Sequence, residues 1–168
     1  MEKQTKGQFY TTNSDYILEN IELPPYINKI IEPFAGKGDL IDWIKKQNYA
    51  HQLEAFDIDP KRFDIIKRDT LLDPPNYENK QIFDLYNTND LYKCFINSLV
   101  DGKCRGGIII IPAGFFFSPR TLDMTCRNKF LSNYKILQIK YFEETVFDDT
   151  STTVVVISFE LSDEKWVE

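Results

Sequence analysis

The fold is decided by the stretch Ile30-Ile31-Glu32-Pro33-Phe34-Ala35-Gly36-Lys37-Gly38-Asp39-Leu40. Its two leading isoleucines are typical of a short buried strand, and the apolar spacing that follows predicts a helix over residues 39 to 47. Gly36 and Gly38 can adopt backbone angles that other residues avoid, so the chain between strand and helix can approach a ligand closely. The first helical amides then point unpaired N–H groups at that ligand. The stretch therefore predicts a nucleotide-shaped cradle.

The segment from Pro33 to Gly38, the glycine turn, is open to a second interpretation. Such turns also occur where a strand and a helix simply pack tightly. The third glycine of the dinucleotide pattern is missing after Gly38, which disfavours a pyrophosphate ligand. Glu32 also suits phosphate poorly, but it suits a cationic or amine-bearing ligand, because opposite charge favours the ionised carboxylate.

Composition limits the classes of protein that this chain can represent. Its 168 residues suit one α/β domain over 1–168 rather than two, and 42% hydrophobic with 14% aromatic residues indicates a globular fold. The net charge of −6 disfavours a surface that grips a polyanion, so DNA contact must be local or come from another domain. Three cysteines without metal-like spacing predict reduced thiols, and no apolar leader or membrane span is evident. We therefore expect a cytoplasmic protein with no membrane contact.

A second strand is predicted within residues 52 to 60, and it ends in carboxylates. Asp57 follows the glycine turn by about 20 residues, where nucleotide-binding α/β proteins place an acid that accepts the ribose hydroxyls. Asp59 can separately cap a short helix with Pro60 at its first position. A third strand, predicted over Phe63 to Arg68, would bring Asp69 to the same rim.

The remaining chain continues the alternation of helices and strands. We expect helices over 14–21, 89–100 and 118–131, strands over 107–112, 134–142 and 152–161, and loops over 71–80, 113–117 and 143–151. The strand at 107–112 is a continuous β-branched run, which is typical of a parallel central strand. This order predicts an α/β three-layer sandwich, mostly parallel with an antiparallel C-terminal edge strand, whose ligand lies beyond the strand carboxyl ends.

Five segments, taken in order, resemble a known family. They are Gly7 to Thr12, Glu32 to Gly38, Asp57 to Pro60, Asp69-Thr70 and Thr145 to Ile157. The series is similar to the N-terminal domain of S-adenosylmethionine-dependent DNA adenine-N6 methyltransferases of restriction–modification systems, in the gamma-type motif order. The resemblance implies a Rossmann-like methyltransferase fold, S-adenosylmethionine as cofactor, DNA as substrate and a cognate restriction endonuclease as partner.

The resemblance also implies a role for individual residues. Tyr10, Thr11 and Thr12 would contact the methionine end of the cofactor, and Glu32, Ala35, Gly36 and Gly38 would line its amino-acid portion. Asp57 would hold the ribose hydroxyls, Ile58 would pack against the adenine ring, and Asp69 would accept from the adenine amino group. Phe147 would stack on the flipped target base, although a ring on this loop can also be an anchor that packs on the sheet edge.

The chain departs from the family at the catalytic element, an Asn or Asp followed by Pro-Pro and an aromatic residue after the fourth strand. Asp73, Pro74 and Pro75 match the first three positions, but Asn76 stands where the aromatic belongs. The motif also lies only four residues after Asp69, so either a segment is lost or the fold is kept without the chemistry. We expect a methyltransferase domain whose DNA binding is weak or supplied by another domain or subunit. The alternatives are a protein or small-molecule methyltransferase and a catalytically silent binding or assembly subunit.

Overall fold

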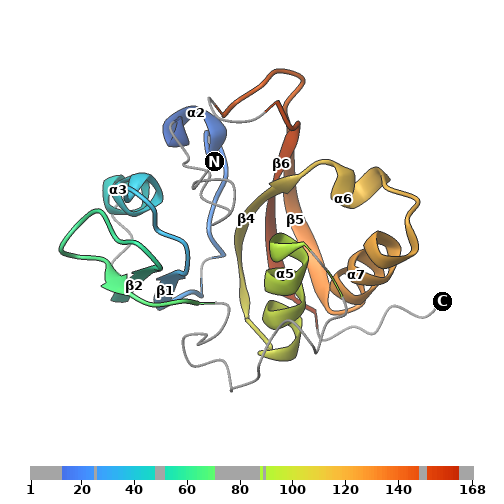
Figure 1. Cartoon of the computed structure of the whole chain (residues 1–168), viewed down its shortest axis with the longest axis horizontal. Coiled ribbons are helices and arrows are strands. Elements are labelled where there is room, and N and C mark those ends of the chain that lie inside the picture. Colours follow the sequence, from blue (N-terminus) through green and yellow to red (C-terminus); the bar gives the residue numbers. More distant parts are fainter. Residues whose placement is uncertain are drawn as a thin grey trace.

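The computed structural model describes residues 13–24, 26–47, 52–70, 88, 90–147 and 151–162, and it is a mixed α/β structure (Figure 1). Its elements are α2 (Ser14–Ile17), β1 (Lys29–Glu32), α3 (Asp39–Lys46), β2 (Gln52–Asp57), β3 (Ile66–Lys67), α5 (Leu91–Asp101), β4 (Gly106–Pro112), α6 (Gly114–Phe117), α7 (Thr121–Leu131), β5 (Tyr134–Tyr141) and β6 (Val154–Leu161). Within the described part of the chain, no helix is both long enough and apolar enough to cross a membrane.

The first sheet is parallel and has the strand order β1-β2-β3. Ile30 lies opposite Leu53, and Phe56 lies opposite Ile66. Helix α3 is the crossover that parallel pairing of β1 and β2 requires, and it buries Ile41, Trp43 and Ile44. The strands and the helix predicted around the glycine turn are therefore confirmed, and the turn lies where β1 ends.

The second sheet is antiparallel and has the strand order β4-β6-β5. Ile109 lies opposite Ile157, and Tyr134 lies opposite Leu161. In Figure 1 the first sheet and α3 lie on the left, and the second sheet lies on the right with α5 and α7. The predicted strands near the C-terminus and their antiparallel pairing are confirmed. The expected position of the last strand is wrong, because β6 lies between β4 and β5 rather than at an edge, and the described strands form one parallel and one antiparallel sheet rather than a mostly parallel one.

The expectation that β4 is a parallel central strand is wrong for the residues described. There its one partner is β6, which runs antiparallel, so β4 is an edge strand of the second sheet. The continuous apolar run has another cause. Ile109 and Ile111 join the core formed with α5 and α7, whereas Ile108 and Ile110 pack on a second core that contains residues of α2, α3 and β1. Both faces of β4 are covered, so both faces are apolar.

Several predicted boundaries also shift. β3 has two residues rather than six, because residues 61 to 65 form turns and Phe63 is fully exposed. Helix α2 ends at Ile17, and the expected loop at 113–117 contains α6, in which Phe115 is buried. Helix α7 begins after Arg120, since Ser118 precedes a proline and is held in an extended conformation.

Candidate functional site

The glycine turn is fixed to the end of β2 by its backbone. The amide of Ala35 donates to the carbonyl of Phe56 at 2.8 Å, and the amide of Gly38 donates back to Ala35 at 2.7 Å. Gly36 has φ 53° and Gly38 has φ 90°, both in the left-handed region that side chains disfavour. The turn therefore has the close, glycine-dependent geometry that the sequence predicts.

Asp57 is the last residue of β2, and its side chain connects that strand to the glycine turn. One carboxylate oxygen accepts a hydrogen bond from the Gly36 amide at 2.8 Å, and the other accepts from the Asp59 amide at 2.8 Å. The residue is 6% exposed. Hydrogen bonds to a charged acceptor are stronger than neutral ones, so Asp57 holds the turn in place. Each oxygen has a further lone pair that could accept a hydrogen bond from a hydroxyl group.

Glu32 ends β1 at the same rim and is partly buried. Its Oε1 accepts a hydrogen bond from the Phe34 amide at 3.1 Å. Burial raises the pKa of Glu32 to about 7, the charge of Asp57 adds to this rise, and the Phe34 amide opposes it. A cation bound between the two carboxylates would favour the ionised form of Glu32.

The other described residues of the predicted site lie just after β1, β2 and β3. Ala35 is buried in the turn, Ile58 is 44% exposed just after β2, and Asp69 follows β3. Thr70 is buried, and its hydroxyl donates to the carbonyl of Pro33 at 2.7 Å, which links the exit of β3 to the glycine turn. The structure thus brings the described residues that were predicted to bind a cofactor to the carboxyl ends of β1, β2 and β3.

Six residues of the predicted site lie outside the described ranges: Tyr10, Thr11, Thr12, Asp73, Pro74 and Pro75. Phe147 is described, and its ring is 9% exposed in the core that also contains Phe142 and Val146. That position corresponds to the loop anchor. A ring buried there cannot support a base without leaving the core, so the structure does not place Phe147 where the stacking role needs it.

Arg62 also lies at this rim, although its sequence context did not identify it as part of the site. The guanidinium of Arg62 donates to the carbonyl of Gly38 at 3.3 Å and to the carboxylates of Asp42 and Asp64. Its short spacing from Asp64 is visible in the sequence, but such spacing is common in surface turns. The contact with Gly38 depends on the fold.

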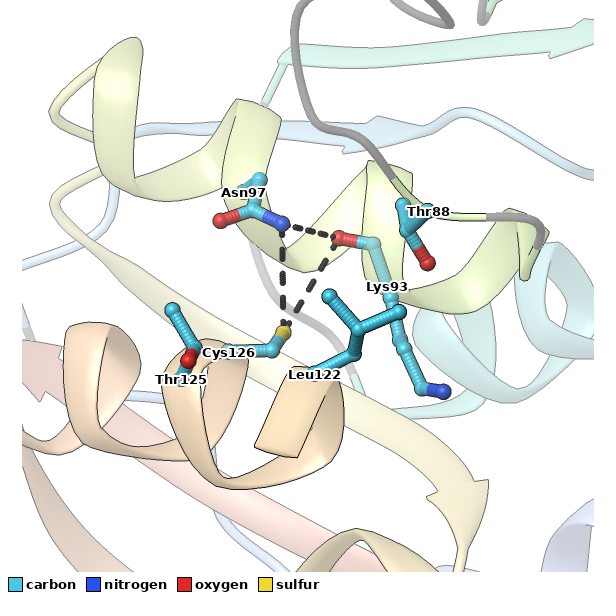
Figure 2. A pocket seen from close by; sticks show the side chains of 6 residues that line it. All are labelled: Thr88, Lys93, Asn97, Leu122, Thr125 and Cys126. Carbon is cyan, nitrogen blue, oxygen red and sulfur yellow. Dashed lines mark hydrogen bonds between the residues drawn. The ribbon is translucent and has the colours of Figure 1, made fainter. Parts of the chain in front are cut away.

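A small cavity between α5 and α7 is a second place to consider (Figure 2). It is lined by Thr88, Lys93, Asn97, Leu122, Thr125 and Cys126 and has a volume of about 60 Å³, far below the roughly 300 Å³ at which small-molecule pockets begin. Figure 2 shows Asn97 turned toward the Lys93 carbonyl, to which its amide donates at 2.9 Å.

The ammonium of Lys93 is paired with Asp90 at 3.0 Å and with buried Asp123. Burial lowers the pKa of Lys93, but hydrogen bonds to Asp123 and Asp90 outweigh that effect and raise it. Burial raises the pKa of the Cys126 thiol to about 11. These charged and thiol groups join two helices, and we assign the cavity no ligand.

Comparison with known proteins adds no family. No protein-family model matches the sequence, and no curated protein sequence matches it. The case for a function accordingly depends on the residues at the ends of β1, β2 and β3.

Proposed function

We propose that this chain is the S-adenosylmethionine-binding domain of a DNA adenine-N6 methyltransferase. The observation that carries the proposal is the convergence of Glu32, Gly36 and Asp57 at one sheet edge. Asp57 bonds directly to the Gly36 amide, and its charge acts on Glu32. Ligands of open α/β sheets lie beyond the carboxyl ends of parallel strands, which is where these residues gather.

The residues suit the chemistry of this cofactor. S-adenosylmethionine has a sulfonium and an amino group, both positively charged, and two neighbouring carboxylates would attract them. Gly36 has no side chain, so a ligand can approach the backbone of the turn closely there, whereas Arg62 occupies the space beside Gly38. Exposed Ile58 offers an apolar surface for the adenine ring. Bound cofactor would supply the methyl group, and the role of these residues is to bind and orient it.

The arrangement of the sheets supports the fold part of the proposal, a Rossmann-like three-layer sandwich. A parallel sheet with a crossover helix precedes an antiparallel sheet at the C-terminal end of the chain. The second sheet has apolar cores on both faces. Layers of helix on both sides of a sheet are the usual solution for α/β domains.

A second candidate is a catalytically silent subunit that binds the cofactor but transfers nothing. Two observations favour it. Phe147 is buried in the core rather than exposed for a base. Asn76 also stands in the sequence where the family's catalytic aromatic residue belongs. A third candidate, methyl transfer to a protein or small molecule, shares the same cofactor site.

Calorimetric titration with S-adenosylmethionine tests the shared step. We expect the parent chain to bind, Glu32→Gln to weaken binding about tenfold through loss of one charged contact, and Glu19→Gln to bind like the parent. Glu19 is a matched control because it is an exposed glutamate paired with Lys140 at 3.8 Å. A parent chain that binds no cofactor would refute both methyltransferase candidates and the cofactor-binding form of the silent subunit.

Transfer of a labelled methyl group then separates the candidates. The acceptors are unmethylated DNA, DNA without adenine, and a protein lysate. Label in adenine-containing DNA alone supports the DNA methyltransferase. Label in protein supports the rival enzyme, and binding without any transfer supports the silent subunit.

A further inference from the structure

We propose that Arg62 is a positioning residue that clamps the glycine turn in its ligand-binding shape. The Arg62 clamp consists of Arg62 with Gly38, Asp42 and Asp64. Its role toward a cofactor rests on the proposed function, whereas its role in holding the turn rests on the contacts of Arg62 alone.

The two sides of the guanidinium contact two different parts of the chain. Toward Asp64, Nε donates to one carboxylate oxygen at 2.9 Å and Nη2 donates to the other at 2.8 Å. Toward α3, Nη1 donates to both oxygens of Asp42 at 2.9 Å. The planar fork of arginine suits such two-point contacts. Arg62 therefore connects the β2–β3 segment to the first turn of α3.

The same side chain touches the turn itself. Nη1 also donates to the Gly38 carbonyl at 3.3 Å. A Cβ atom built on Gly38 would overlap Nη1 and would lie 2.9 Å from Cζ of Arg62, so the guanidinium packs where a side chain would otherwise be. Gly38 has a left-handed φ and immediately precedes α3. The conformation of the glycine turn and the position of the guanidinium are thus fixed together.

The clamp differs from an ordinary surface ion pair, which contributes little to stability. The side chains of Arg62 and Asp64 are each only 27% exposed, and Lys45 also reaches Asp64 at 3.2 Å. The hydrogen bond from Arg62 is the main reason that the pKa of Asp64 is lowered to about 2. The pair of Arg62 and Asp64 therefore stays ionised throughout the neutral range, so its contacts do not depend on pH there.

The test compares Arg62→Met and Arg62→Lys with the control Lys46→Met. Lys46 lies on α3, the helix that contains Asp42, and forms an exposed ion pair with Asp15 at 2.7 Å, so the control removes the same charge and one ion pair away from the turn. Amide hydrogen exchange is followed in residues 34 to 40 and in β6, and S-adenosylmethionine is titrated into each variant.

We expect Arg62→Met to speed exchange in residues 34 to 40 about tenfold without changing β6. Cofactor affinity should fall about tenfold if the turn then holds its binding shape one-tenth of the time. Arg62→Lys should be intermediate, because an ammonium keeps the charge but cannot form the fork. Lys46→Met should match the parent chain in both measurements.

Two results would overturn the clamp. One is exchange in residues 34 to 40 that is the same in Arg62→Met as in Lys46→Met. The other is equal acceleration in β6, which would indicate general destabilisation. A parent chain that binds no cofactor refutes the proposed function and the cofactor role of Arg62, while selective exchange in the turn would still establish that Arg62 holds it.

Discussion

Replacing Asp57 with alanine should lower the free energy of unfolding by about 3 kcal/mol. The side chain is 6% exposed and accepts two backbone hydrogen bonds, from Gly36 and Asp59, each 2.8 Å long. A hydrogen bond to a charged group contributes about 1.5–3 kcal/mol. Because both donor residues are partly exposed, water can replace some of the loss, so we take the lower value for each bond. For a chain of this length the melting temperature should fall by about 6–12 °C.

Urea unfolding followed by circular dichroism measures this change, and Asp15→Ala is the control. Asp15 is an exposed carboxylate paired with Lys46 at 2.7 Å, so its loss should change stability by less than about 1 kcal/mol. If Asp57→Ala is no less stable than Asp15→Ala, the two backbone hydrogen bonds do not hold the glycine turn. That rim would then lack the fixed turn that a binding site requires.

Glu32 has a pKa of about 7 in the folded chain against an ordinary value of 4.5, so the folded state holds more protons between these values. Stability should therefore fall as pH rises from about 4.5 to 7, and Glu32→Gln should remove this slope in urea unfolding measured between pH 5 and pH 8. Asp123→Ala should cost about 3 kcal/mol, because buried Lys93 would lose its buried carboxylate partner and keep only the exposed Asp90, and the double variant Lys93→Met with Asp123→Leu should recover much of the loss. Phe147→Ala should cost about 3–5 kcal/mol in thermal unfolding if its ring is a core anchor, whereas Phe117→Ala, at 73% exposure, should change little. A small loss of stability in Phe147→Ala would instead indicate that the ring lies at the surface.

The elements that the sequence predicts well are those with local causes. Helix α3 begins at Asp39 because an apolar period follows a glycine, and β2 ends at Asp57 because alternation gives way to carboxylates and a proline. Asp57 and the glycine turn come together as predicted, since parallel strands bring their carboxyl ends to one edge.

The elements that it predicts poorly depend on distant partners. The antiparallel pairing of β4 is set by β6, and nothing within residues 107–112 encodes that choice. β3 is cut short where Arg62 and Asp64 fold the preceding residues into turns. Arg62 itself was missed because its contact with Gly38 exists only in three dimensions. Phe147 could not be assigned from sequence, because an apolar ring on a loop suits a base and a core equally.

The outer side of β4 has a consequence for handling the protein. Within the described part of the chain, β6 pairs with one edge of this strand and no strand pairs with the other, although both faces of β4 are covered. A strand edge without a partner strand can pair with a further extended chain, which begins aggregation. What opposes that process is mutual repulsion between molecules of net charge −6, and dissolved salt screens it. Concentrated samples should accordingly stay clear in dilute buffer and turn cloudy as the ionic strength rises.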